Sequence, residues 1–224
     1  MGKMIDFTRP DGSLAPGYLV EAAGDSHLPG VVMLEEWWGI NDQIVQTAER
    51  LGAAGFRVLV PDLFRGRTAA TGDEANHLAQ GLDFADAATQ DAPGAAQYLR
   101  TSGSAKVGIT GFCMGGALTL LSVMHTKAYD AAVVWYGLPP EEAGDPASIT
   151  IPLQMHWAIQ DAFFPIAAVD KLEARLHAGN VANESYRYDA KHAFYNPAGL
   201  GNHHPEHAEK AWQRSVEFFK KHLR

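Results

Sequence analysis

Short apolar runs and longer stretches of helical periodicity alternate along this chain. A run such as Gly-Val-Val-Met-Leu at 30–34, bounded by polar residues, is typical of a strand buried on both faces. Strands that alternate with helices in this way predict an α/β fold, with a mostly parallel sheet covered by helices on both faces. We predict such strands at 30–34, 56–62, 106–110, 131–136, 153–158 and 184–188, and an edge strand at 18–20.

Helix signals lie between these strands. Asn41 is a typical N-cap, and Ile44, Val45, Ala48 and Leu51 fall on one face of a helix that ends at the glycines in positions 52 and 55. The segment 73–84 predicts a looser amphipathic helix. Further helices are expected at 89–99, where a proline lies in the first turns, and at 117–124, 165–178 and 205–223. No repeat or low-complexity linker divides the chain, so we expect residues 1–224 to form a single domain.

Composition excludes several classes of protein. The formal net charge is −8 and lysine and arginine form no cluster, which argues against a nucleic-acid partner. No apolar run approaches the length of a membrane span, and the stretch 1–6 lacks the apolar core of a signal peptide. The single cysteine cannot form an internal disulfide and favours a reducing compartment. We therefore expect a cytoplasmic enzyme with a small-molecule substrate, as a monomer or a small homo-oligomer.

The segment around the lone cysteine predicts a nucleophile. The apolar run that starts at Val107 leads into Gly111-Phe112-Cys113-Met114-Gly115, and a helical pattern follows at once. A strand, a tight turn and a helix in this order form the nucleophile elbow, here with cysteine as the nucleophile. A Cβ on either flanking glycine would collide with the neighbouring strand or helix. The alternative for Cys113 is an inert buried thiol.

Two further residues follow Cys113 in the order that an elbow enzyme requires. A thiol nucleophile needs a base, and the base needs an acceptor that orients it. Asp161 comes after the predicted strand at 153–158, and His192 comes after the one at 184–188. This reproduces the chain order nucleophile, acid, histidine. Taken alone, Asp161 could be the N-cap of the next helix and His192 an ordinary loop histidine.

The chain resembles the dienelactone hydrolase family of α/β-hydrolases over nearly its whole length. The segments that carry the resemblance are Glu36-Trp37-Trp38-Gly39-Ile40-Asn41, Pro61-Asp62-Leu63, the elbow at 111–116, Trp135-Tyr136-Gly137, Asp161 and His192-Ala193-Phe194. The resemblance implies the α/β-hydrolase fold and carboxymethylenebutenolidase-like hydrolysis of small esters or lactones, with no cofactor or metal.

The same resemblance assigns roles to residues around the elbow. Cys113, His192 and Asp161 match the family's catalytic triad. Glu36 matches a glutamate that holds the resting thiol neutral and accepts its proton when substrate arrives. The backbone N–H groups of Trp37 and Met114 match the oxyanion hole, where one donor is typically worth about 3–4 kcal/mol of barrier.

The walls of the pocket are less well defined by the sequence. The candidates for lining it are Trp38, Trp135, Tyr136, Phe194 and Asn196, although aromatic residues at strand ends also serve as core. The prototype of the family carries two arginines that bind a substrate carboxylate. One of those positions is Asn196 here, the stretch 73–78 offers no arginine for the other, and Arg65 and Arg67 lie only near it. The charge of the substrate is left open.

Three other interpretations remain to be compared. The pattern His203-His204-Pro205-Glu206-His207 spells an inverted zinc-protease motif, but the proline lies between the two ligands, so we expect His203 to precede the helix and no metal site to form. An amidotransferase would carry glutamate where Phe194 stands. A redox-sensing or non-catalytic thiol protein on the same fold is the alternative to a cysteine hydrolase.

Overall fold

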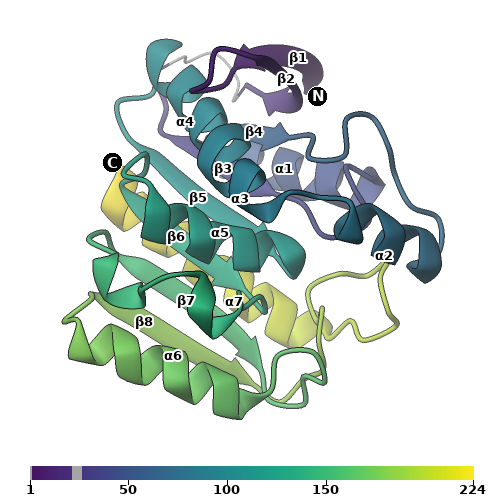
Figure 1. Ribbon diagram of the computed structural model, residues 1–224, viewed down its shortest axis with the longest axis vertical. Coiled ribbons are helices and arrows are strands. Elements are labelled where there is room, and N and C mark those ends of the chain that lie inside the picture. Colours follow the sequence, from purple (N-terminus) through teal and green to yellow (C-terminus); the bar gives the residue numbers. More distant parts are fainter. Residues whose placement is uncertain (1, 22–26) are drawn as a thin grey trace.

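The computed structural model describes residues 2–21 and 27–224, and one twisted sheet runs through them (Figure 1). Its strands lie in the order β1-β2-β4-β3-β5-β6-β7-β8. All neighbours from β4 to β8 pair in parallel, and β1 and β2 are antiparallel additions at one side. The bounds are β1 Lys3–Thr8, β2 Leu14–Val20, β3 Gly30–Leu34, β4 Arg57–Pro61, β5 Val107–Phe112, β6 Ala131–Trp135, β7 Leu153–Ala158 and β8 Asn183–Tyr188.

The predicted mostly parallel sheet is confirmed, with one correction at its N-terminal side. The segment Tyr18–Val20 was expected at the edge, but β2 lies between β1 and β4, and β1 forms the edge. The sequence did not predict β1 because only Phe7 in it is buried and Ile5 is partly buried, which is too short an alternation to indicate a strand. Of the stretch before β3, residues 22–26 lie outside the described residues.

The helices cover both faces of the sheet, as predicted (Figure 1). Asn41 caps the first one, where its side chain accepts the backbone N–H of Ile44. No helix of the described residues combines the length and apolar character needed to cross a bilayer. The bounds are α1 Asp42–Ala53, α2 Gly72–Gln80, α3 Phe84–Asp86, α4 Ala92–Thr101, α5 Met114–His125, α6 Ile166–Ala178 and α7 Pro205–Leu223, with one π-helical turn, η1 Ala87–Asp91, and two 3₁₀ turns, η2 Glu141–Ala143 and η3 Pro146–Ser148.

The region between β4 and β5 differs from the predicted helices at 73–84 and 89–99. The first helix ends at Gln80, and a continuous helical run then extends from α3 through η1 to α4. Pro93 lies inside this run rather than at its start. Proline cannot donate a backbone hydrogen bond, and the turn before it widens so that the N–H of Ala92 bonds to the carbonyl of Ala87, five residues back.

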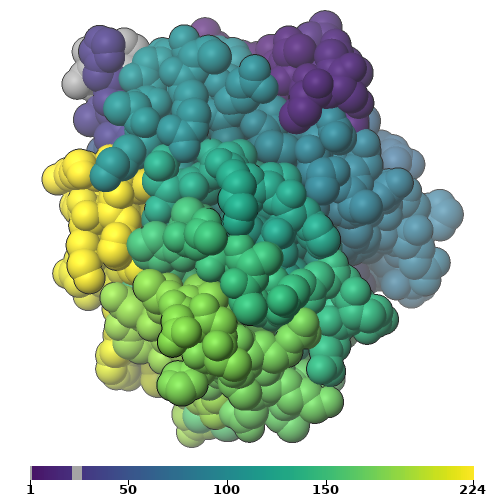
Figure 2. Space-filling view, turned by 60° about the vertical axis from the view of Figure 1, so that its left-hand side comes forward, coloured from purple at the N-terminus to yellow at the C-terminus, as the bar shows by residue number. Residues whose placement is uncertain are grey.

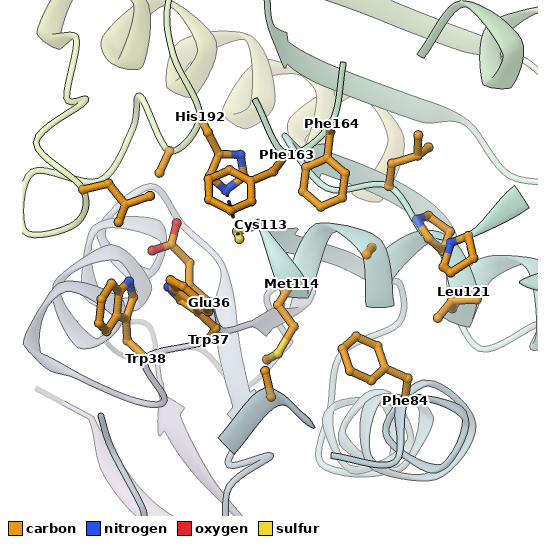
Figure 3. A pocket seen from close by; sticks show the side chains of 17 residues that line it. Glu36, Trp37, Trp38, Phe84, Cys113, Met114, Leu121, Phe163, Phe164 and His192 are labelled. Carbon is orange, nitrogen blue, oxygen red and sulfur yellow. Dashed lines mark hydrogen bonds between the residues drawn. The ribbon is translucent and has the colours of Figure 1, made fainter. Parts of the chain in front are cut away.

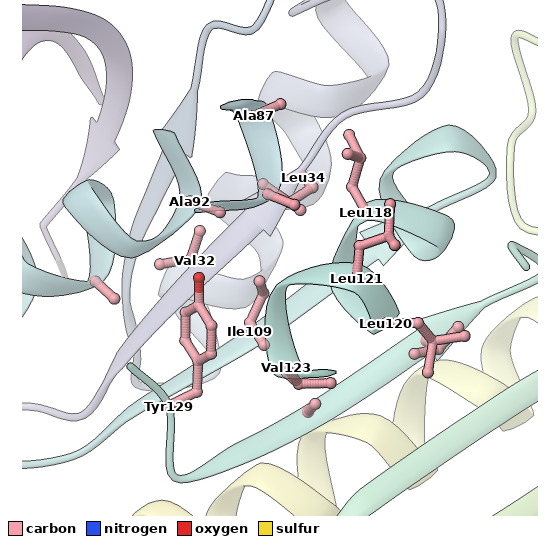
Figure 4. Close-up of a cluster of buried hydrophobic side chains, with 14 of the residues drawn as sticks. Val32, Leu34, Ala87, Ala92, Ile109, Leu118, Leu120, Leu121, Val123 and Tyr129 are labelled. Carbon is pink, nitrogen blue, oxygen red and sulfur yellow. The ribbon is translucent and has the colours of Figure 1, made fainter. Parts of the chain in front are cut away.

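Alternating strand residues divide the core between the two faces. Val32 and Ile109 point to the face covered by α4, α5 and α6, where Leu118 and Leu121 pack (Figure 4). The neighbouring Val31 and Met33 point to the opposite face, which α1 and α7 cover. This arrangement leaves the carboxyl ends of the parallel strands free to present functional side chains.

The N-terminal strands are fastened to the rest of the chain by ion pairs. Arg9 follows β1 and reaches Asp86 at 2.5 Å and Asp91 at 3.5 Å, both in the helical run before α4. In the space-filling view the purple N-terminal strands accordingly lie against the blue-green segment that contains this run (Figure 2). The register places Arg9 on the side of the carboxyl end of β4, so these ion pairs fasten the edge of the sheet to the helical run there.

Candidate active site

Cys113 occupies the strained turn between β5 and α5. Its backbone has φ 54° and ψ −114°, a conformation that residues other than glycine rarely adopt. A Cβ on Gly111 would lie 2.1 Å from the carbonyl oxygen of Gly115, and one on Gly115 would lie 2.4 Å from that of Leu34. Both positions therefore require glycine, as the sequence predicts. The thiol is exposed only in part.

His192 and Asp161 lie in line with this thiol. The Nε2 atom of His192 is 3.0 Å from Sγ of Cys113 (Figure 3). Its Nδ1 atom is 2.7 Å from Oδ2 of Asp161. A bond from Nδ1–H to the carboxylate leaves Nε2 free to accept a proton. The other carboxylate oxygen accepts the backbone N–H groups of Phe163 and Phe164, at 2.8 and 3.0 Å, which fixes the carboxylate. The N-cap of α6 is Pro165, so Asp161 does not cap that helix.

The environment of Cys113 favours the neutral thiol. Burial raises the pKa of Cys113 strongly, and the negative charges of Glu36 and Asp161 raise it further. The backbone N–H of Met114 acts in the opposite direction. The resting enzyme therefore holds its proton on sulfur until something else accepts it.

Glu36 follows β3 and lies buried beside the thiol. Tyr136 donates its hydroxyl hydrogen to Oε1 at 3.3 Å, and Asn196 donates an amide hydrogen to Oε2. Burial raises the pKa of Glu36, while the two donors and His192 lower it. Tyr136 is held at φ 36°, and the centroid of its ring lies 5.3 Å from that of the His192 ring. Glu36 is thus a fixed carboxyl group on the wall of a cavity that lies over Cys113.

The proposed oxyanion donors also lie at this cavity. Met114 is the first residue of α5, where backbone N–H groups have no acceptor within the helix and the helix dipole is positive. Trp37 follows β3, which pairs with β5 so that Leu34 lies opposite Gly111. Both residues line the cavity that Cys113 opens into. The pairing of β3 with β5 is what brings these two loop segments together.

A cavity of about 290 Å³ lies over Cys113. Figure 3 shows Glu36 and Trp37 on one side of the thiol and Phe84 and Leu121 on the other. The lining residues are Glu36, Trp37, Trp38, Ala79, Phe84, Cys113, Met114, Ala117, Leu121, Leu138, Pro139, Pro140, Phe163, Phe164, His192, Ala193 and Leu200.

Of the candidate pocket residues, Trp38 lines the cavity and four others do not. Trp135, Tyr136 and Phe194 are buried in the core on the face of α1 and α7, and Asn196 is buried against Glu36. These three aromatic residues therefore pack beneath the site and do not line the cavity. The sequence did not indicate Phe84, Leu138 or Leu121, because they come from segments without a motif and meet only through the fold.

The arginines near the site do not reach the cavity. Arg65 bonds to Asp91 at 2.8 Å, and Nε of Arg67 donates to the carbonyl of Phe64 at 3.1 Å. From α2, the cavity receives Ala79 rather than a cation.

The zinc-protease pattern does not form a helical pair of ligands. His204 is the N-cap of α7, so His203 precedes the helix, as expected from Pro205. Within residues 2–21 and 27–224, no three His, Cys, Asp or Glu side chains are grouped so that they could hold a metal ion.

Comparisons with known proteins agree with this architecture. The family model "Dienelactone hydrolase family" matches residues 15–223. A protein named "Putative carboxymethylenebutenolidase" from Azospirillum brasilense is 31% identical, over 98% of this chain and 100% of its own length. A solved structure named "Putative Dienelactone Hydrolase", from Klebsiella pneumoniae, has a TM-score of 0.86 at 26% identity, over 99% of this chain and 100% of that one.

A second solved structure extends the structural comparison. This dienelactone hydrolase-like promiscuous phosphotriesterase from metagenomic libraries has a TM-score of 0.88 at 21% identity, over 100% of this chain and 99% of its own, and so shares the fold. The family match covers nearly all of the chain, including β5, α5 and every strand of the parallel sheet. The chain therefore belongs to the dienelactone hydrolase family and is a carboxylic ester hydrolase with the α/β-hydrolase fold.

Proposed function

We propose that this enzyme hydrolyses small esters or lactones through an acyl-cysteine intermediate on Cys113. The observation that carries the proposal is the unbroken chain from Asp161 through His192 to Cys113, with atoms 2.7 and 3.0 Å apart at the floor of an apolar cavity. All of these groups come from one chain, so a monomer suffices. The free thiol suits a reducing compartment, and we place the enzyme in the cytoplasm.

The first half of the reaction moves one proton from sulfur to the leaving group. When substrate fills the cavity, Glu36 accepts the proton of the Cys113 thiol, and the thiolate adds to the ester carbonyl. The carbonyl oxygen becomes an oxyanion that accepts the N–H groups of Trp37 and Met114. As the intermediate collapses, the bond to the alkoxide breaks and Glu36 returns the proton to it. The products are a thioester on Cys113 and a free alcohol.

The second half uses His192 as the base. Its Nε2 atom takes a proton from water, and the hydroxide adds to the thioester carbonyl, with the oxyanion on the same two donors. Collapse breaks the carbon–sulfur bond, releases the acid and returns the proton from His192 to sulfur. Asp161 stabilises the imidazolium and keeps Nδ1 protonated throughout. Over both halves, one ester and one water give one acid and one alcohol.

Turnover of an activated ester tests this proposal. We expect wild-type protein to hydrolyse p-nitrophenyl butyrate and Cys113→Ala to lose that turnover while keeping its melting temperature. Wild-type turnover in Cys113→Ala would overturn the role of Cys113. A wild-type protein whose thiol oxidises readily but never acylates would instead favour the redox-sensing alternative.

A further inference from the structure

The catalytic cavity has almost no polar lining. Its ionisable side chains are Cys113, His192 and Glu36, and none of the described residues that line it is lysine or arginine. Glu36 itself carries the charge that would repel an anion. Burying a carboxylate without a cation or hydrogen-bond donors is costly, because it loses its hydration and gains no partner. The lining therefore selects against a negative charge next to the reacting carbonyl.

The nearby cations do not supply the positive charge that the cavity lining lacks. Both oxygens of Asp91 accept from Arg65, at 2.8 and 2.9 Å. Asn196 is also committed: its amide nitrogen donates to Glu36, and its amide oxygen accepts the N–H of Ala198 at 2.8 Å. Pairing Arg65 with a substrate carboxylate would therefore break its contact with Asp91.

A second cavity of about 380 Å³ adjoins the catalytic one. The two share a wall, because five residues line both: Leu138, Pro139, Pro140, Phe163 and Phe164. Figure 3 shows Phe163 and Phe164 next to His192, and their rings lie 4.8 and 5.6 Å from the imidazole. The rings of Phe163 and Phe164 therefore lie between the reacting centre and the second cavity.

The second cavity continues with apolar side chains, among them Leu120, Met124 and Leu172. Its two cations already have partners. Arg175 donates to the carbonyls of Glu141 and Gly144, at 3.1 and 3.0 Å, and Lys171 pairs with the Glu141 carboxylate at 3.5 Å. The interior is thus suited to hydrocarbon rather than to a second charge.

From these observations we infer that the enzyme selects uncharged esters or lactones whose hydrophobic part extends from the catalytic cavity, past Leu138 and Phe164, into the second cavity. This inference rests on the proposed function. Each CH₂ group that the second cavity takes out of water increases kcat/KM by about fourfold.

A chain-length series with a blocking variant tests the second cavity. Ala168 on α6 lines only this cavity, and Ala167 beside it is exposed and lines neither. We expect wild-type kcat/KM to rise at least about tenfold between four and eight carbons, either from p-nitrophenyl butyrate to octanoate or from butyl to octyl acetate. Ala168→Trp should lower that ratio at least about fivefold, and Ala167→Trp should leave it within about twofold.

A charge-matched pair tests the catalytic cavity. p-Nitrophenyl hexanoate and the p-nitrophenyl monoester of glutaric acid have acyl parts of similar length, but only the second ends in a carboxylate. We expect kcat/KM for the anion to be at least about 100-fold lower. Ala79→Arg adds a cation at the half-buried rim of the cavity on α2 and should raise kcat/KM for the anion by about tenfold or more.

The outcomes distinguish this inference from the proposed function. If neither ester series is turned over and no thioester forms, the proposed function fails. Two results would refute the inference while leaving the proposed function standing, provided that the esters are turned over. In the first, neither ester series shows a dependence of kcat/KM on chain length that Ala168→Trp reduces. In the second, the glutarate monoester is hydrolysed as well as the hexanoate.

Discussion

Asn196 donates a hydrogen bond to the carboxylate of Glu36, although the two residues are 160 positions apart in the chain. Tyr136 donates to the other oxygen of the same carboxylate at 3.3 Å. The two donors fix a negative charge beside the thiol of Cys113, and this charge is one of the causes that raise the pKa of the thiol. In the proposed mechanism, Glu36 therefore controls when the Cys113 thiol ionises.

The first prediction concerns that control. Glu36→Gln removes the charge that raises the pKa of Cys113, so the thiolate should form at lower pH. We expect the pH midpoint of alkylation by iodoacetamide, followed by intact mass, to shift downward. Glu35→Gln is the matched control, because Glu35 is not among the groups that raise this pKa, and it should leave the midpoint unchanged. An unshifted midpoint in Glu36→Gln would contradict the role given to Glu36.

Glu35 leads to a prediction about stability. Burial and the nearby Asp62 raise its pKa well above the usual value, while the N–H of Leu63 and the charge of Arg65 oppose the shift. Within the part of the chain that the structure describes, Oε2 of Glu35 and Oδ1 of Asp62 are buried without a hydrogen-bond partner. Because the folded state binds this proton more tightly, stability falls as pH rises from the unfolded pKa of about 4.3 through the raised folded value.

Glu35→Gln should remove this pH dependence. The amide oxygen can still accept the N–H of Leu63, and the amide group supplies a donor where the carboxylate has none. We expect a gain of about 1–2 kcal/mol in unfolding free energy at pH 8 and a smaller gain at pH 5, measured by urea denaturation. Glu142→Gln, at an exposed position, should change neither value. A gain that is the same at both pH values would refute the linkage.

Asp161→Asn should separate the two halves of the reaction. An amide nitrogen would donate to Nδ1 of His192, so Nε2 would carry the proton and could not accept one from water. In the proposed mechanism, acylation uses Glu36 as the proton acceptor. We therefore expect an initial burst of p-nitrophenol followed by a steady-state kcat about 100-fold below wild type. The exposed control Asp189→Asn should stay within about twofold. Wild-type kcat in Asp161→Asn would exclude the orienting role.

At the elbow, the addition of a single methyl group should have a large effect on stability. An added Cβ on Gly115 would lie 2.4 Å from the carbonyl oxygen of Leu34, and backbone cannot move aside cheaply. Gly115→Ala should therefore lower the unfolding free energy by at least about 2 kcal/mol. At Gly72, in the first turn of α2, no atom lies within 4 Å of the added Cβ, so Gly72→Ala should be neutral or slightly stabilising. Thermal unfolding of the two variants compares them directly.

The central part of the fold could be predicted from sequence because its strands are buried on both faces. The run at 30–34 and the one at 153–158 match β3 and β7 in their bounds, and the cap at Asn41 forms as expected. The edge strand β1 could not be predicted, because it buries one side chain in six residues. Local patterns report burial, and an edge strand has little of it.

In the candidate site, too, the sequence predicted one part and not the other. The order Cys113, Asp161, His192 predicted three groups that the structure brings into one hydrogen-bonded chain. Which residues line the cavity depends on the direction in which individual side chains point at the ends of strands. Trp135 turns toward the core, while Phe84 enters the cavity from a short helix that has no motif. Such directions are set by packing between segments far apart in sequence, which no local pattern records.

The central claim is that Cys113 carries the acyl group, and intact mass measured after rapid acid quench tests it most directly. With p-nitrophenyl butyrate in excess, the account predicts an intact-mass increase of one butyryl group, which peptide mapping should place on the peptide that contains Cys113. The adduct should accumulate further in Asp161→Asn and be absent in Cys113→Ala. Turnover without any acyl adduct on Cys113 in wild type and in Asp161→Asn, or an adduct that persists in Cys113→Ala, would contradict the account.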